Sequence, residues 1–313
     1  MSITVPSIDL PTTRGRLSGV QVVFQTPFTA SGAVDYATLD AEIDWLFANG
    51  ANGVVFAMVS ELLRLSSEER DAISAAVARR SMGRGDCVLS VGAESIDIAI
   101  RHSLVARDAG ATAVMAAPPT LFRVDDDSLF RYFVAIANAA EVELVVQDAS
   151  GYVGAPLSID LQRRLQVELG DRVSFKPEAH PIGPRLTQLR DATDGAARVF
   201  EGTGGLYLID SYRRGAIGTM PAGDLVWALV PLWNALERGD YAAAYRIGGP
   251  LAQIVSLQTS LDTFVAIEKR NLVRQGVFRS DFMRQPADQD IDPQMLDEVD
   301  RLVDRLREAV QGA

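Results

Sequence analysis

The sequence predicts an α/β fold, a (β/α)₈ TIM barrel followed by a three-helix C-terminal extension, on three observations. First, eight short apolar runs alternate with eight stretches in which apolar residues recur at helical spacing. Second, these units are closely similar, which favours a closed ring of strands over the alternative, a doubly wound open sheet. Third, the chain has 313 residues, 48% of them apolar, whereas a barrel of this kind needs ~250 residues.

The predicted strands are short apolar runs, and the predicted helices carry apolar residues on one face. The strands are expected at residues 19–27, 53–57, 87–91, 113–116, 143–147, 173–176, 198–200 and 216–220. The first helix has Leu39, Ile43 and Leu46 on one face and ends before Gly50, and the second begins at Ser66 with acidic residues in its first turn. The helices are expected at residues 35–49, from 66 onward, 96–109, 127–140, 158–169, 182–189, 206–213 and 225–236.

Three more helices are expected after the barrel, at residues 241–257, 261–275 and 293–310. The predicted division of the chain is therefore an N-terminal leader (1–18), a (β/α)₈ barrel (19–238) and a C-terminal helical extension (239–313). Helices appended to a barrel cover a face or build a subunit contact, so we expect a homo-oligomer, a dimer or tetramer.

The charge balance excludes several classes of partner. The chain has 30 basic and 41 acidic residues and a net charge of −11, so nothing offsets repulsion by the phosphates of nucleic acid or of anionic membranes. No run is long enough to cross a membrane, and the N-terminus lacks a signal-peptide core. The single Cys87 forms no intrachain disulfide, and two histidines give no metal-ligand spacing. These features predict a cytoplasmic protein that needs no metal or other cofactor.

Lysine is rare in this chain, and Lys176 and Lys269 are its two examples. Lys176 ends a short apolar run, and Pro177 indicates that a strand stops there. Burial disfavours the charged form of an amine and lowers its pKa, which suits it to form a Schiff base with a carbonyl compound. An ion pair with Glu178 explains this stretch equally well. Catalytic groups of such barrels lie at the C-terminal ends of strands, which favours the imine.

Other residues at strand ends are candidates for the same site. Glu178 is interpreted as an acid/base, with a counter-ion role for Lys176 as the alternative. Gln147 ends an apolar run and is a candidate to bind a substrate hydroxyl. His180 is either a proton shuttle or a loop residue that bonds backbone groups. Thr219, at the end of the eighth strand, is a further candidate for substrate binding.

Two loops are candidates to bind an anionic group. Backbone amides near Val59 and Ser60 are expected to hold a substrate carboxylate, and Glu61 is interpreted as a partner for backbone amides. The glycine-rich run at 202–205, beginning at Gly202, resembles an anion site before a helix, although a tight turn explains it equally well.

Two further charged or titratable residues are interpreted as solvent-facing. His102 is expected on a helix surface, and Lys269 on a solvated helix face.

The order of motifs resembles the dihydrodipicolinate synthase / N-acetylneuraminate lyase family of class I Schiff-base enzymes over nearly the whole chain. The matching features are Thr26-Pro27-Phe28, Glu61 followed by Leu65-Ser66-Ser67-Glu68-Glu69, Pro118, the loop 151–154 and Phe175-Lys176. The resemblance implies a barrel in which the strand-six lysine, here Lys176, forms an imine with a 2-keto acid.

Some positions differ from the members that make dihydrodipicolinate. The family's threonine pair, tyrosine pair, strand-five tyrosine and substrate-binding arginine fall at Met58 and Val59, Pro119 and Thr120, Gln147, and Tyr152. The motifs Ser60-Glu61, Gln147-Asp148 and Lys176-Pro177-Glu178 are instead similar to those of the subgroup that acts on 2-keto-3-deoxy sugar acids, notably 2-keto-3-deoxyarabonate dehydratase.

The expected function is dehydration of a 2-keto-3-deoxy sugar acid through a lysine imine, with a small-molecule 2-keto acid as the partner. Loss of the strand-five tyrosine removes the usual base for aldol cleavage, which favours dehydration over release of pyruvate and an aldehyde. The alternatives are such an aldolase, a dihydrodipicolinate synthase, a phosphosugar enzyme that uses the 202–205 loop, and a retired barrel that senses sugar acids and binds another protein.

Overall fold

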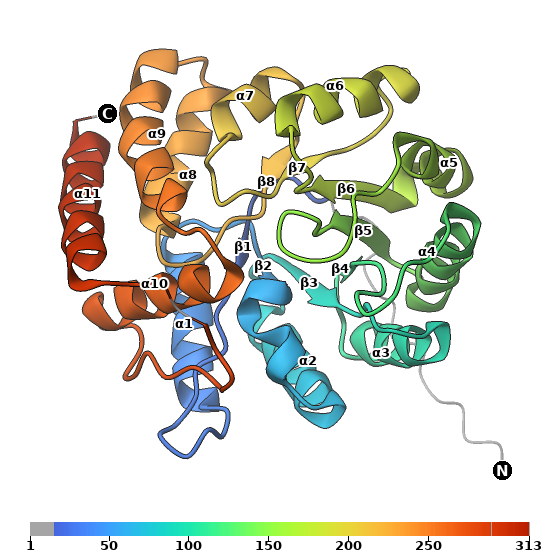
Figure 1. Cartoon of the computed structure of the whole chain (residues 1–313), viewed down its shortest axis with the longest axis horizontal. Coiled ribbons are helices and arrows are strands. Elements are labelled where there is room, and N and C mark those ends of the chain that lie inside the picture. Colours follow the sequence, from blue (N-terminus) through green and yellow to red (C-terminus); the bar gives the residue numbers. More distant parts are fainter. Residues whose placement is uncertain (1–15, 289, 313) are drawn as a thin grey trace, which may run out of the picture.

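The computed structural model describes residues 16–288 and 290–312. Eight parallel strands form a nearly closed barrel, with helices between them around its outside (Figure 1). The strands are β1 (Gly19–Val23), β2 (Gly53–Phe56), β3 (Asp86–Ser90), β4 (Ala113–Ala116), β5 (Glu143–Asp148), β6 (Val173–Pro177), β7 (Phe200–Glu201) and β8 (Gly218–Thr219). The predicted TIM barrel with C-terminal helices is therefore confirmed. The predicted leader lies almost entirely outside the described residues.

The ring is closed by strands of unequal length. β1 pairs with both β2 and β8, and Gly218 permits the latter contact because a Cβ there would lie 2.3 Å from the carbonyl oxygen of Gly19. The last seam, between β6 and β7, consists of one bridge between Phe175 and Val199, supported by a 2.9 Å hydrogen bond from the Phe175 amide to Arg198. The catalytic candidate Lys176 directly follows this bridge.

The helices begin and end close to the predicted residues. They are α1 (Tyr36–Ala48), α2 (Ser67–Ser81), α3 (Ile96–Asp108), α4 (Asp126–Ala140), α5 (Ile159–Leu169), α6 (Ile182–Ala192), α7 (Leu208–Arg213) and α8 (Val226–Glu237). At the start of α2, the Ser66 side chain accepts from the Glu69 amide and Glu69 accepts from the Ser66 amide, so two otherwise unpaired donors are satisfied.

Three helices follow the barrel, α9 (Tyr241–Ser256), α10 (Leu261–Arg274) and α11 (Pro293–Gln311). They gather on one side of the barrel, where α11 packs against α8 and α9 (Figure 1). Helix α10 instead reaches the short 3₁₀ turn Met58–Ser60 that follows β2. One of the appended helices therefore lies against the end of the barrel where the site candidates are found.

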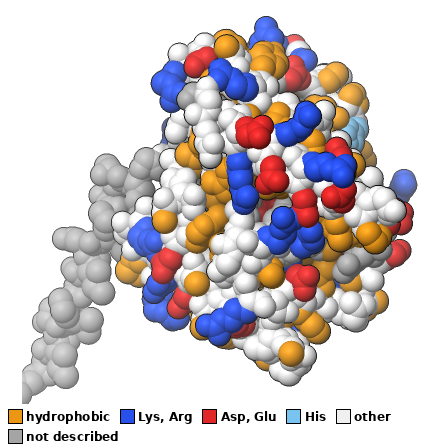
Figure 2. Space-filling view, turned by 90° about the vertical axis from the view of Figure 1, so that its left-hand side faces the viewer, with side chains coloured by type: hydrophobic (Ala, Val, Ile, Leu, Met, Phe, Trp, Pro, Cys, Tyr) orange, Lys and Arg blue, Asp and Glu red, His pale blue; other side chains and the backbone are white. Residues whose placement is uncertain are grey.

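The core has two parts, as the alternation of strand side chains requires. Side chains that point inward, such as Val55, Met115 and Phe200, fill the barrel, while their neighbours, such as Val54 and Val114, pack against the helices. On the face shown in Figure 2, basic and acidic side chains are interspersed. Among the described residues, no helix is long and apolar enough to span a membrane.

A group of buried acidic side chains lies between β1, α1 and α10. Glu42 and Glu268 are both 0% exposed, and Gln25 joins them. The backbone N–H of Gln25 donates to Glu42 at 2.9 Å, and its side-chain amide donates to Glu268. Glu42 Oε2, Glu268 Oε1 and Gln25 Oε1 have no hydrogen-bond partner among the described residues. Burial raises the pKa of Glu42 and of Glu268 well above their ordinary values, and it raises the pKa of nearby Asp224 to about 6. The interior at this point favours neutral carboxylic acids.

The substitution Glu42→Gln should therefore make the protein more stable than the wild type in neutral and alkaline solution. A pKa raised in the folded state means that stability is fully present below the unfolded value, here 4.5, and is lost as the pH rises through the folded value. The side-chain amide introduced at position 42 still offers an oxygen that accepts from the backbone N–H of Gln25, and it cannot ionise. We expect the free energy of unfolding to exceed that of the wild type by about 1–3 kcal/mol at pH 8, with a smaller difference near pH 5.

Urea unfolding between pH 5 and pH 8 measures this effect. Asp40→Asn on the same helix is the control, because Asp40 is not fully buried. Parallel pH profiles for wild type and Glu42→Gln would contradict the assignment of Glu42 as a buried neutral acid.

Candidate active site

Lys176 lies at the C-terminal end of β6, inside the barrel mouth. Its side chain is 5% exposed, and Nζ is 2.9 Å from Oε1 of Glu178. Strand geometry places residues 176 and 178 on the same side of the chain, and Pro177 ends the strand between them. The amine and the carboxylate thus form a buried ion pair, so both sequence interpretations of Lys176 describe part of the geometry.

Gln147 completes this group from the neighbouring strand. It is the register partner of Lys176 across β5 and β6, and its Nε2 donates to Oε2 of Glu178 at 2.8 Å. Burial raises the pKa of Glu178, while the charge of Lys176 and the hydrogen bond from Gln147 act in the opposite direction. A carboxylate held between an amine and an amide, with a raised pKa, is suited to exchange protons with the amine.

Gly202 lies against the lysine side chain. A Cβ at this position would be 2.9 Å from Cγ of both Lys176 and Glu178, so a side chain here would displace the pair. The predicted site residue Gly202 is thus adjacent to the ion pair, and the structure assigns it a steric role there.

Glu201 is a residue of the mouth that the sequence interpretation missed. It is buried and accepts hydrogen bonds from the amides of Thr203 at 2.7 Å and Gly205 at 3.2 Å and from the Thr219 hydroxyl at 2.7 Å. The amides expected to bind an external anion at 202–205 therefore bind this internal carboxylate, and Thr219 is engaged with it too. The available signal in the sequence was the position of Glu201, a polar residue directly after the predicted strand at 198–200.

Ser60 is also occupied within the protein. Its hydroxyl donates to the Phe24 carbonyl at 2.6 Å, its amide donates to the Ala57 carbonyl at 3.0 Å, and the residue is fully buried. The expectation that Ser60 binds a substrate carboxylate is not supported, because neither donor is free. The adjacent Val59 is half-buried.

The loop between β5 and α5 covers the mouth, where it curls over the ends of the strands in Figure 1. Asp148 holds both its ends by accepting from the amides of Ser150 at 3.2 Å and Leu157 at 3.0 Å. Gly151 lies against the residue that follows β6, since a Cβ there would lie 2.8 Å from the carbonyl oxygen of Glu178.

Tyr152 follows this contact and is half-buried. Burial raises the pKa of its phenol, and the charges of Glu178, Glu268 and Glu201 raise it further. Glu178 lies just after β6, Glu268 in α10 and Glu201 in β7, so groups from three elements influence the phenol. The sequence marked Tyr152 as a departure from the family pattern but gave it no role.

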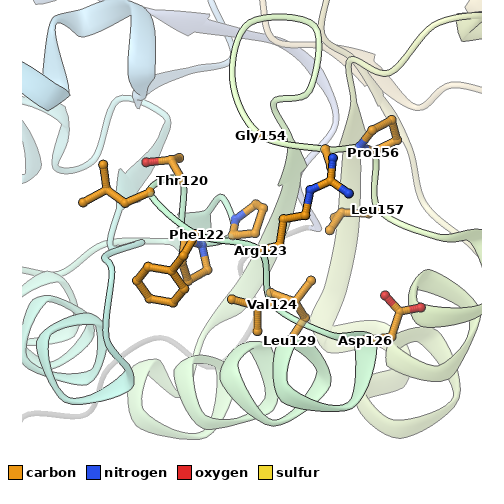
Figure 3. A pocket seen from close by; sticks show the side chains of 13 residues that line it. Thr120, Phe122, Arg123, Val124, Asp126, Leu129, Gly154, Pro156 and Leu157 are labelled. Atoms are coloured by element: carbon orange, nitrogen blue, oxygen red, sulfur yellow. The ribbon is translucent and has the colours of Figure 1, made fainter.

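Two cavities adjoin this arrangement. One of about 210 Å³ begins at Gln147 and extends between the loops after β2, β3 and β4. The other, of about 450 Å³, lies between the loops after β4 and β5, and the Arg123 side chain extends across it toward Gly154 and Pro156 (Figure 3). Both cavities are lined by Pro118 and Thr120. Of the group formed by Lys176, Glu178 and Gln147, Gln147 lines the smaller cavity.

Lys269 was expected on a solvated face, and this prediction is wrong. Its side chain is fully buried, forms an ion pair with Glu61 and donates to the Phe282 carbonyl at 2.9 Å. Glu61 also accepts from the Arg284 amide at 3.2 Å, which agrees with its predicted role as a partner for backbone amides. Helix α10 turns Lys269 toward the barrel. The charged residues on either side of Lys269 in the sequence had instead indicated a solvated face.

The two histidines differ from each other. His102 was expected at the surface but is buried, with Nδ1 2.9 Å from Asp71. His180 is exposed, and its ring packs edge-on against Tyr207. Within residues 16–288 and 290–312, no three His, Cys, Asp or Glu side chains come together as metal ligands. The chemistry that this mouth offers is therefore that of an amine, a carboxylate, an amide and a phenol.

Comparisons with known proteins agree with this geometry. The model of the dihydrodipicolinate synthetase family matches residues 16–306. The L-2-keto-3-deoxyarabonate dehydratase of Azospirillum brasilense is 26% identical over 279 residues, which cover 87% of this chain and 89% of that protein. A 4-hydroxy-tetrahydrodipicolinate synthase of Thermomicrobium roseum is 29% identical over 250 residues, which cover 78% and 82%.

Solved structures show the same fold. The 4-hydroxy-tetrahydrodipicolinate synthase of Methylacidiphilum fumariolicum SolV superposes with a TM-score of 0.86 at 21% identity and covers 95% of this chain and 98% of that one. A prophage protein of the dihydrodipicolinic acid synthase family from E. coli K12, solved in complex with pyruvate, has a TM-score of 0.85 at 23% identity and covers 93% and 98%.

The buried pair between Lys269 and Glu61 makes a prediction about stability. Lys269→Met leaves Glu61 buried without its cation, which should lower the free energy of unfolding by about 3–5 kcal/mol. The double variant Glu61→Gln/Lys269→Met should lose less than the sum of the two single variants, because no charge is then left unpaired. Urea denaturation gives the three values.

Arg270→Met is the matched control on the same helix. Arg270 is half-buried and pairs with Asp300, so its loss should cost no more than about 1 kcal/mol. Equal losses in the free energy of unfolding for Lys269→Met and Arg270→Met would show that the buried pair stabilises the protein no more than the half-buried pair does.

Proposed function

Since the chain belongs to the dihydrodipicolinate synthetase family, whose members are class I lyases, we propose that it dehydrates a 2-keto-3-deoxy sugar acid through an imine on Lys176. The observation that carries this proposal is the group of Lys176, Glu178 and Gln147 at the end of β5 and β6. The likeness to the L-2-keto-3-deoxyarabonate dehydratase of A. brasilense supports this substrate class.

The first step needs an uncharged amine. Glu178 Oε1, 2.9 Å from Nζ, takes the proton that Lys176 must lose. The amine then attacks the C2 carbonyl of the keto acid, and Glu178 returns its proton to the resulting hydroxyl, which leaves as water. A protonated imine remains, and Glu178 is a carboxylate again. This cation withdraws electrons from C3, so Glu178 can remove a C3 proton and leave an enamine. General acid–base help at such a step contributes roughly 10²–10⁴-fold.

The second step expels the C4 hydroxyl. The electron pair of the enamine forms the C3–C4 double bond as the C4–O bond breaks, and a proton must reach the leaving oxygen for it to depart as water. We assign this proton to the Tyr152 phenol, which lies in the field of Glu178 and of two other mouth carboxylates. The free oxygen of Gln147 would orient the hydroxyl. Water then hydrolyses the unsaturated imine and releases Lys176.

The same geometry favours dehydration over aldol cleavage. Retro-aldol cleavage needs a base that takes the proton of the C4 hydroxyl. Gln147 cannot be that base, and the raised pKa of the Tyr152 phenol disfavours the deprotonated form that a base needs. The aldolase remains the second candidate because both reactions share the imine and the enamine.

We also propose that the enzyme acts in the cytoplasm as a homo-oligomer. The chain has a single cysteine, a usage that suits a reducing compartment. Leu121 and Phe122, in the loop after β4, are 81% and 57% exposed, and such neighbouring apolar side chains are typical of a surface that a second copy covers.

Borohydride trapping tests the imine. Incubation with pyruvate or a 2-keto-3-deoxy acid, followed by reduction, should add the mass of the reduced adduct to Lys176. Because Lys269 is the other lysine of the chain and is fully buried, peptide mapping assigns the adduct without ambiguity. Lys176→Ala should abolish both the adduct and turnover while the circular dichroism spectrum is unchanged. Full activity in that variant would end the proposal.

Tyr152→Phe tests the proton donor separately from the imine. The variant should still form the borohydride adduct on Lys176, but dehydration should slow by roughly 10²–10⁴-fold because the leaving hydroxyl has no acid. Tyr207→Phe is the control, since Tyr207 is an exposed tyrosine that packs on His180. If Tyr152→Phe turns over at the wild-type rate, another group supplies the proton.

A further inference from the structure

The cavity next to Gln147 has a lining that restricts what it can bind. It is the 210 Å³ cavity described above, and it is lined at one end by Gln147, whose side chain is hydrogen-bonded to Glu178. Complete ligand sites usually measure about 300–1,000 Å³, so this volume fits one end of a ligand rather than a whole one. Its side walls are apolar and come from three loops and the start of α3. They are formed by Met58, Leu62, Leu63, Ala93, Ile98 and Ala117.

The charged residues that line the cavity hold its loops in place. Nη2 of Arg70 donates to the carbonyls of Ser90 at 3.3 Å and Gly92 at 3.0 Å, and its Nε is buried without a hydrogen-bond partner among the described residues. Glu94 accepts from the amide and hydroxyl of Thr120, at 2.9 and 2.8 Å. These contacts fix the loops after β3 and β4. Polar side chains are thus few on the wall beyond Gln147, and Glu94 and Nη2 of Arg70 are bound within the protein.

A hydroxyl placed deep in this cavity would lose its water without gaining equivalent partners. Burial of an unpaired hydroxyl is unfavourable, whereas burial of a methyl group is favourable. A distal carboxylate would be repelled by Glu94, which lies on the wall, and Nη2 of Arg70 is already bound to carbonyls.

We propose that this cavity holds the far end of the substrate and that this end is apolar, so the preferred substrate is a 2-keto-3-deoxy acid that terminates in a methyl or alkyl group. This inference rests on the proposed function. With C2 on Lys176 and the C4 hydroxyl at Gln147, the carbons beyond C4 enter the cavity. Recognition therefore changes along the substrate, from polar groups at the reacting carbons to apolar walls at the tail.

The test compares two 2-keto-3-deoxy acids of equal length and configuration that end in CH₃ or in CH₂OH. The methyl-terminated acid should have the higher kcat/KM by roughly 10-fold or more, the range that apolar pockets give for small changes. Ile98→Ser, which places a hydroxyl on the cavity wall, should reduce this ratio. Ile96→Ser is the matched control, because Ile96 lies on the same helix at similar exposure and does not line the cavity.

The outcomes separate this inference from the proposed function. If both acids form the borohydride adduct and are dehydrated with equal kcat/KM, or if the hydroxymethyl acid is preferred, the apolar-end inference is overturned and the lyase remains. The inference is also overturned if Ile98→Ser and Ile96→Ser leave the same ratio. If neither acid forms an adduct on Lys176, the proposed function fails and the inference fails with it.

Discussion

The ion pair between Lys176 and Glu178 is the constraint on which the barrel mouth depends. Two charges removed from water need compensating partners, and removal of either one would leave the other buried and unpaired. The surroundings are arranged around this need. Gln147 binds the second carboxylate oxygen, and Gly202 leaves the space that the lysine side chain requires. A buried amine that is poorly hydrated can lose its proton to the adjacent carboxylate. A hydrated lysine at the surface has no such buried partner.

A second buried pair extends the site beyond the barrel. Lys269 joins α10 to Glu61 in the turn after β2, and Glu268, the residue before it, contributes to the field at Tyr152. The C-terminal helices are therefore part of the mouth as well as a covering of one side. Both lysines of the chain are buried and paired with glutamate, while arginine provides the basic groups at the surface.

Local patterns in the sequence were sufficient for the fold and for the placement of Lys176, Glu178 and Gln147 beside one another. Each strand is an apolar run that ends at the mouth, so Lys176, Glu178 and Gln147 could be placed together from strand ends alone. Lys269 and His102 could not be placed correctly, because the face that a helix turns inward depends on what packs against it. Glu201 and Tyr152 were missed for a related reason. Their environments consist of carboxylates and amides from other elements, and only the closed ring brings those groups within reach.

The attachment of the loop after β5 has a consequence for the evolution of such barrels. Asp148 fastens the beginning and the end of this loop to the strand that carries Gln147, so the residues between can be exchanged while the anchor stays in place. Substitutions at positions 153–156 would alter the roof of the mouth without replacing Tyr152 or the amine beneath it. New substrate specificities can thus arise through changes in this short loop while Lys176, Glu178 and Gln147 stay the same.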